Sequence, residues 1–103
     1  MSIVSIITVG DARQAEEIAR RLVEEKLAAC VNIIPSVRSV YRWKDRVEES
    51  TELMLVVKTE QRVFEKMKRR VLELHSYELP EIIALNISEG LEGYLDWINA
   101  NVE

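Results

Sequence analysis

The chain has 103 residues, the usual length of a single domain, which we expect to span 1–103 and to bury a core without disulfides or a structural metal. Its formal net charge of -4 argues against a nucleic-acid partner. Its one cysteine permits no disulfide within the chain, which fits a reducing compartment. The apolar run 3–9 is too short to cross a bilayer and no signal-peptide pattern precedes it, so we expect a cytoplasmic protein without a membrane partner.

The first elements are a strand and a helix. Residues 2–9 form a β-branched run that ends at Gly10, which is typical of a strand and its stop. Asp11 can cap a following helix, with Gln14 in the capping-box position. The apolar side chains that recur at helical spacing are Ala15, Ile18, Ala19, Leu22, Val23 and Leu27. They predict an amphipathic helix of about four turns.

A long β-hairpin is predicted next, with arms over 31–43 and 47–58 around a polar tip at 44–46. Pro35 cannot donate to a ladder, so it marks a bulge, a bend or an edge position. Near the tip one arm is basic and the other acidic, which favours modest cross-strand pairing in a register that the sequence does not fix. The charged side chains are Arg38, Arg42 and Lys44, and Glu48, Glu49 and Glu52.

A second helix is predicted from Thr59 or Glu60 to about His75, followed by a strand after Pro80 and by a C-terminal helix. The order β-α-β-β-α-β predicts an α+β ferredoxin-like sandwich, with two helices on one face of a four-stranded antiparallel sheet. Hairpin arms of about 12 residues reach about 40 Å, whereas a helix of about 16 residues covers only about 24 Å. The far part of the hairpin should therefore project, and we interpret it as an oligomerisation arm.

Several stretches of the chain resemble the CutA family of divalent-cation tolerance proteins. They are AACVNIIPSVRSVYRWKDRVEE, LMLVVKT and ELHSYELPEIIAL, and the resemblance runs nearly end to end. It implies a ferredoxin-like subunit in a tight homotrimer, tolerance of copper and other divalent cations, and an architecture similar to the PII-type signalling proteins. The chain departs from the family at three turn positions, with Asp45 where glycine is common and with Ser76 and Asn86 where proline is frequent.

Two residues are candidate metal ligands. By the resemblance, Cys30 is a soft ligand for copper or another thiophilic ion, although free cysteines are usually small buried hydrophobes. His75 stands at a helix end, where it serves either as a cap or as a ligand or acid–base group. With one cysteine and one histidine per chain, a competent metal site needs Met, carboxylate or backbone ligands, or contributions from a neighbouring subunit.

The remaining candidate residues predict a pocket between subunits. Beside His75, the side chains of Tyr77, Glu78 and Glu81 can coordinate a divalent ion or bind a polar molecule. If Tyr41 and Trp43 on the arm meet the 75–81 loop of a neighbour, they line a cleft with it. Packing against the neighbour is the simpler interpretation of the two aromatic residues. Lys58 is expected there either to balance the carboxylates or to hold an anion.

The predicted function is therefore that of a trimeric protein that binds copper or other divalent ions and contributes to metal tolerance. The alternatives are a PII-like sensor with a small ligand in its intersubunit cleft, or a trimeric scaffold without a ligand. No standard catalytic motif occurs in the sequence, and we do not expect an enzyme.

Overall fold

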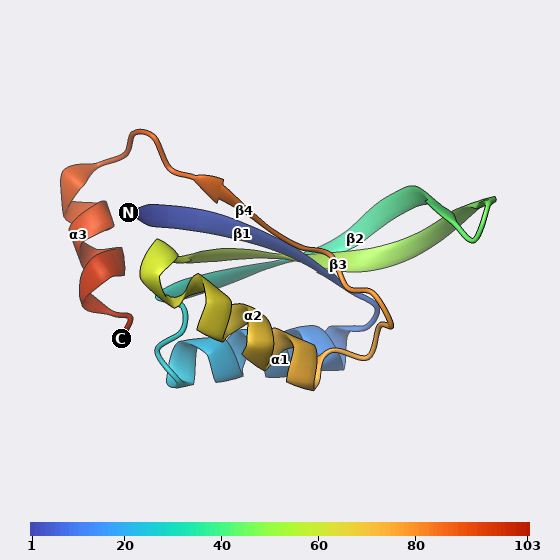
Figure 1. Ribbon diagram of the computed structural model, residues 1–103, viewed down its shortest axis with the longest axis horizontal. Coiled ribbons are helices and arrows are strands. Elements are labelled where there is room, and N and C mark those ends of the chain that lie inside the picture. Colours follow the sequence, from blue (N-terminus) through green and yellow to red (C-terminus); the bar gives the residue numbers. More distant parts are fainter.

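The computed structural model describes all 103 residues (Figure 1). Its elements are β1 (Ser2–Val9), α1 (Ala12–Glu24), β2 (Cys30–Trp43), β3 (Arg46–Glu60), the 3₁₀ turn η1 (Gln61–Val63), α2 (Phe64–Leu74), β4 (Ile82–Asn86) and α3 (Glu92–Ala100). The strands form one antiparallel sheet in the order β2-β3-β1-β4. The predicted α+β sandwich is confirmed. None of the helices has the length and apolar character needed to cross a membrane.

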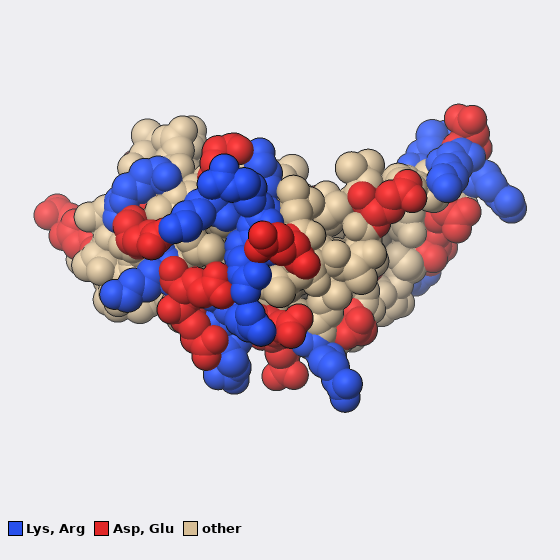
Figure 2. Space-filling view, turned by 60° about the horizontal axis from the view of Figure 1, so that its bottom comes forward, with Lys and Arg blue, Asp and Glu red and all other residues tan.

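Helices α1 and α2 cover one face of the sheet (Figure 1). Ile7, Val9, Leu55 and Val57 point to this side, because they are buried in one cluster with residues of both helices. The outer surface of the helices carries Lys and Arg side chains interspersed with Asp and Glu, as Figure 2 shows. The helices are therefore apolar on the side that faces the sheet and charged on the side that faces the solvent, as expected for amphipathic helices over a core.

The start of α1 agrees with the prediction in part. Asp11 is the N-cap, and its carboxylate accepts a hydrogen bond of 2.9 Å from the backbone N–H of Gln14. The Gln14 side chain does not close a capping box. Its amide donates to the carbonyl of Leu74 at 3.4 Å and accepts from the hydroxyl of Ser76 at 3.1 Å. These bonds connect the start of α1 to the end of α2.

The hairpin of β2 and β3 extends beyond both helices as a two-stranded arm (Figure 1). The pairing shifts between Ile34 and Val37, and β2 lies at the edge of the sheet, so Pro35 stands at an irregular edge position as expected. Trp43 pairs with Arg46 across a two-residue turn in which Lys44 and Asp45 have φ of 51° and 64°. Both turn residues are thus in the left-handed region, which identifies a tight hairpin of the primed type.

The second helix begins later than predicted, because β3 continues to Glu60 and η1 follows it. Glu60 pairs with Ser2 in the sheet. Its buried carboxylate accepts from the Ser2 hydroxyl at 2.5 Å and lies 3.0 Å from the N-terminal ammonium of Met1. Burial alone would raise the pKa of Glu60, but the Ser2 hydroxyl, the ammonium and Arg62 outweigh it and lower the pKa. These long-range contacts fix Glu60 in the strand.

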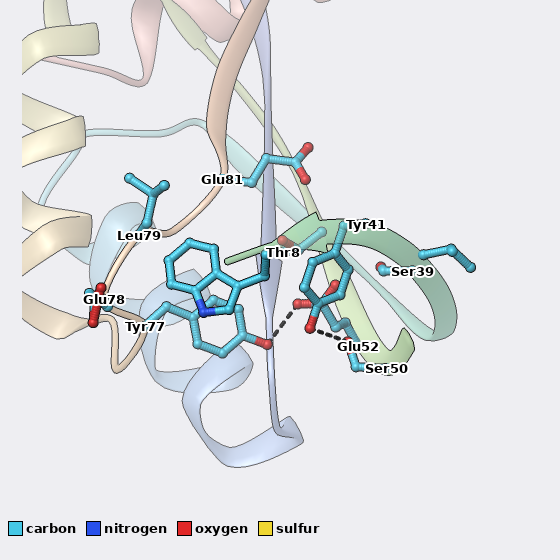
Figure 3. Close-up of a pocket in the computed structure, with 11 residues that line it drawn as sticks. Thr8, Ser39, Tyr41, Ser50, Glu52, Tyr77, Glu78, Leu79 and Glu81 are labelled. Carbon is cyan, nitrogen blue, oxygen red and sulfur yellow. Dashed lines mark hydrogen bonds between the residues drawn. The ribbon is translucent and has the colours of Figure 1, made fainter. Parts of the chain in front are cut away.

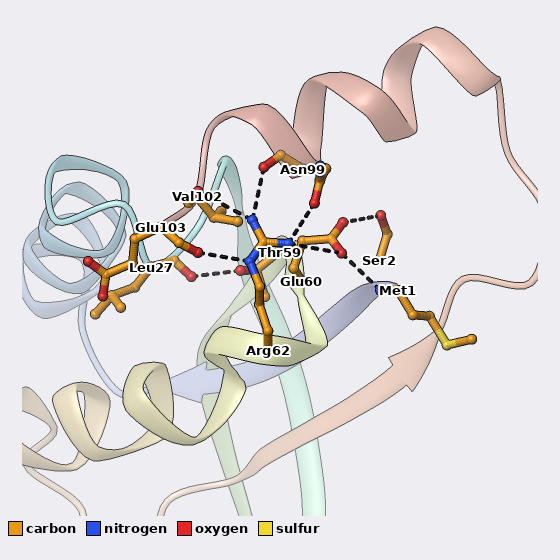
Figure 4. Close-up of polar contacts among 9 residues, drawn as sticks. All are labelled: Met1, Ser2, Leu27, Thr59, Glu60, Arg62, Asn99, Val102 and Glu103. Carbon is orange, nitrogen blue, oxygen red and sulfur yellow. Dashed lines mark hydrogen bonds and ion pairs between the residues drawn. The ribbon is translucent and has the colours of Figure 1, made fainter.

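Arg62 fastens α3 to the end of the sheet (Figure 4). Its guanidinium donates to the carbonyl of Glu103 at 2.9 Å, to the Asn99 side chain at 2.5 Å and to the Asn99 carbonyl at 3.1 Å. Ile98 and Val102 are buried beside it in a small second cluster with Ala29 and Val63. The C-terminal helix thus covers the sheet end that lies opposite the arm (Figure 1).

The sheet face opposite α1 and α2 carries a contiguous apolar patch next to Asn32 and Lys58. Side chains alternate along each strand between the core and this opposite face. The apolar ones on the opposite face are Val4, Ile6, Ile34, Met54, Val56, Ile83 and Leu85. The exposed fractions of Ile34, Ile83 and Leu85 are 44%, 50% and 59%. We call this surface the open face.

A candidate functional site under the hairpin arm

A groove of about 640 Å³ lies where the arm leaves the sheet (Figure 3). The end of β1, the two strands of the arm and the loop before β4 form its walls. The lining residues are Thr8, Ser39, Val40, Tyr41, Trp43, Ser50, Glu52, Tyr77, Glu78, Leu79 and Glu81. The volume is typical of small-ligand sites, and no lysine or arginine is among these residues.

Glu52 and Tyr77 are joined by a hydrogen bond across the groove. The Tyr77 hydroxyl donates to Glu52 Oε2 at 2.6 Å (Figure 3). Burial, followed by the hydrogen bond to the Glu52 carboxylate, raises the pKa of the Tyr77 phenol. Tyr77 therefore stays protonated and donates this bond throughout the neutral range.

Gly10 allows Tyr77 to cross the end of β1. A Cβ atom on Gly10 would lie 3.0 Å from the Tyr77 hydroxyl oxygen and 3.2 Å from its Cε1 atom. Because Gly10 has no side chain, the phenol can pass over the backbone and reach Glu52.

His75 lies behind the groove. It is buried, and its Nε2 atom is 2.8 Å from the carbonyl oxygen of Thr8. Its Nδ1 accepts a hydrogen bond of 3.1 Å from the backbone N–H of Tyr77. Because Nδ1 accepts, Nε2 carries the proton and donates to Thr8, so both ring nitrogens have partners. In this arrangement His75 holds the loop in place and offers no free nitrogen to a metal.

Cys30 and Lys58 lie away from the groove. They pair with each other across β2 and β3, and Lys58 also pairs with Val4, four residues before Thr8 on β1. At strand rise that separation is about 13 Å. The Lys58 ammonium donates to the Asn32 side chain, and Cys30 Sγ lies 3.8 Å from the same oxygen. The structure thus brings neither Lys58 to the groove nor Cys30 to His75.

The residues of one chain do not fit a metal ion well. The structure contains no group of three or more His, Cys, Asp or Glu side chains placed to hold one. Cys30 has no second thiolate or imidazole beside it, since His75 stands near Thr8. A complete coordination sphere would therefore need Met, backbone or water donors, or donors from a second chain.

Five of the predicted pocket residues do line the groove, namely Tyr41, Trp43, Tyr77, Glu78 and Glu81. In this groove the arm and the loop belong to one chain. The cleft between the arm and a neighbour's loop stays a prediction. The sequence prediction missed the other lining residues, which are Thr8, Ser39, Val40, Ser50, Glu52 and Leu79. The alternation of side chains along the arm could have indicated Glu52, because it shares a strand face with Ser50.

Fold and site together define a ferredoxin-like α+β protein with a ligand-sized, acidic and aromatic groove under a projecting hairpin. Residues 3–101 match the family model described as CutA1 divalent ion tolerance protein, and the chain belongs to this family.

Its relatives include a divalent-cation tolerance protein CutA of Thermus thermophilus, 52% identical over 98% of both chains. The chloroplastic CutA of Arabidopsis thaliana is 42% identical over 94% of this chain, which spans only 53% of that relative. Among solved structures, a divalent cation tolerance protein of Thermus thermophilus superimposes with a TM-score of 0.98 at 51% identity, covering 100% of both chains. The Archaeoglobus fulgidus protein, described as periplasmic, gives 0.96 at 43% identity, also over 100% of both chains.

Proposed function

We propose that the protein serves divalent-cation tolerance in the cytoplasm as a homotrimer that binds copper or another divalent cation without catalysing a reaction. Membership of the family supports the link to divalent cations, because the Thermus thermophilus and Archaeoglobus fulgidus relatives are described as divalent-cation tolerance proteins. The observation that carries the assembly is the open face.

The open face supports association of identical chains. A contiguous apolar sheet surface is rarely left in water by a stable monomer. Helices α1 and α2 lie on the other side, and α3 lies at the sheet end. The arm adds the exposed side chains Val40 and Val47 and the unpaired edge of β2. Both surfaces fit a neighbouring copy of the chain, as the resemblance to trimeric proteins implies.

The assembly is tested by measuring the mass in solution with light scattering after size exclusion. We expect three times the chain mass of 11.9 kDa for the wild type. Replacing Leu85 by Glu places a charge on the open face and should dissociate the assembly. The same replacement at Leu72, which is exposed on α2, should leave the assembly intact. A wild-type mass of 11.9 kDa would contradict the trimer.

The metal site is proposed to be completed between subunits. Cys30 is partly exposed on the same side of the sheet as the open face, so donors of a second chain can reach it. His75 is proposed as the second protein ligand, although it must give up its bond to Thr8 to bind a metal. Titration calorimetry with copper should show weaker binding by Cys30→Ser and His75→Ala than by the wild type. Identical binding by all three proteins would remove both residues from the site.

A second candidate role is that of a PII-like sensor, which the groove favours. Its volume and its aromatic residues Tyr41, Trp43 and Tyr77 suit a small molecule better than a bare ion. Together with Glu78 and Glu81 from the loop, they line one continuous surface. A ligand bound there should raise the midpoint of thermal unfolding in the presence of a metal chelator. A metabolite screen without any shift would count against this role.

A further inference from the structure

Glu52 has an oxygen that no group of the chain engages. The residue is only 7% exposed, and its one hydrogen bond is the bond from Tyr77 to Oε2. It takes part in no ion pair of the structure, and no buried polar side-chain atom is left without a partner. Oε1 is therefore reached from the groove. A carboxylate that is largely withdrawn from water and has no cation beside it favours a positively charged partner.

The rest of the groove favours the same charge. Its walls contain the carboxylates of Glu52, Glu78 and Glu81 and no basic side chain. Figure 3 shows Glu52 on the arm and Glu81 in the loop before β4, apart from each other. Because the acidic groups do not converge as a metal site, they suit an extended cation better than a single ion.

The aromatic residues add an attraction of their own. Tyr41 and Trp43 line the same groove as Glu52, and an indole or phenol face attracts ammonium groups. The Trp43 ring already has one ammonium near it, since Lys44 Nζ lies 5.7 Å from the ring centroid. The alkyl stem of an amine would contact Val40 and Leu79.

We propose that this groove binds an aliphatic diammonium ligand, with one ammonium on Glu52 Oε1 and the other at Glu81. The inference deepens the second candidate role, because it names the ligand class of the same groove. It requires neither Cys30 nor a metal ion. A neutral diol of the same chain length lacks the positive charge that Glu52 attracts. A dicarboxylate of the same length is repelled by the acidic walls of the groove.

The test uses three probes with the same four-carbon chain, namely 1,4-diaminobutane, 1,4-butanediol and succinate. Titration calorimetry at low salt should detect binding of the diamine alone. Glu52→Gln keeps an oxygen for the Tyr77 hydroxyl and removes the charge, so diamine affinity should fall at least tenfold. The matched control is Glu49→Gln, because Glu49 is exposed, pairs with Arg38 and does not line the groove. The Glu49→Gln variant should bind the diamine with the same affinity as the wild type.

Three results would overturn the inference: no binding of the diamine, equal diamine affinity in Glu52→Gln, or equal binding of the diol. The first result is also expected if a basic side chain of a neighbouring subunit fills the site at Glu52. The mass in solution and the copper titration are measured on the same samples. Failure of the diamine with an intact trimer and intact copper binding would therefore leave the proposed function standing.

Discussion

The Tyr77 hydroxyl donates a 2.6 Å hydrogen bond to the buried carboxylate of Glu52, and so joins the loop before β4 to β3 across the end of β1. The bond links residues 25 positions apart and closes one side of the groove. His75 holds the backbone of Tyr77 in place, because its Nδ1 atom accepts a hydrogen bond from the Tyr77 backbone N–H.

Tyr77→Phe should lower the free energy of unfolding by about 1–2 kcal/mol, because it removes a hydrogen bond to a charged group from a phenol that is itself partly exposed. Chemical denaturation at one fixed protein concentration measures this change, since an assembly gains stability with concentration. Tyr94→Phe is the matched control, because the Tyr94 phenol does not contact Glu52. An unchanged stability of Tyr77→Phe would mean that the bond contributes nothing net.

The stabilisation from Tyr77 should disappear at high pH. Burial and the Glu52 carboxylate raise the pKa of Tyr77 in the folded protein, whereas an unfolded tyrosine titrates near about 10. Below that value both states hold the proton and the stabilisation is complete. As the pH rises further, the unfolded state loses its proton first, so stability falls. The stability difference between wild type and Tyr77→Phe should therefore be constant below about pH 10 and shrink above it. A difference that grows with pH would contradict the raised pKa.

Gly10→Ala should displace Tyr77, because the new Cβ would lie 3.0 Å from its hydroxyl oxygen. We expect a loss of about 1–3 kcal/mol, as for other overpacked sites. Gly93 in α3 offers the control, since a Cβ there meets nothing within 4 Å. Gly93→Ala should instead gain about 0.5–1 kcal/mol from helix propensity. Thermal unfolding of the two variants should thus shift in opposite directions.

Asp45→Gly at the arm tip should raise stability by about 0.5–1 kcal/mol, because glycine adopts a positive φ without strain. Asp45 has φ of 64° in the hairpin turn. Asp45→Ala keeps the Cβ atom and loses the polar side chain that tolerates this conformation, so it should lower stability. The denaturation midpoint should be highest for Asp45→Gly, intermediate for the wild type and lowest for Asp45→Ala.

Arg62→Lys should loosen α3, because an ammonium cannot replace the planar fork that holds Asn99 and Glu103. We expect a loss of about 1–2 kcal/mol from these charge-assisted bonds. Hydrogen exchange in 92–100 should accelerate. Lys66→Ala removes only a surface ion pair with Glu103 and should cost under about 1 kcal/mol.

The fold could be predicted because its signals are local. The β-branched run of β1, the Asp11 cap and the irregular strand position at Pro35 each act within a few residues, and all were confirmed. The start of α2 was misplaced because Glu60 is held in β3 by Ser2 and the N-terminus, contacts that no local pattern contains.

The groove could be predicted only in part for the same reason. Tyr41, Trp43 and Tyr77 stood out as aromatic side chains on an arm and in a loop. Glu52 was interpreted as one of the arm's surface charges, because its burial depends on the strand register and on Tyr77 crossing from the loop. Lys58 was expected in a pocket between subunits, which stays a prediction; within one chain the register places it beside Cys30.

The central claim is that the proposed cation site is completed between chains, since one chain places no three His, Cys, Asp or Glu side chains together. Copper titration of the wild type against Leu85→Glu, with mass and circular dichroism recorded on the same samples, tests it most directly. We expect a folded Leu85→Glu protein of 11.9 kDa that binds copper at least tenfold more weakly than the trimeric wild type. A folded monomer that binds copper as tightly as the wild type would contradict the claim.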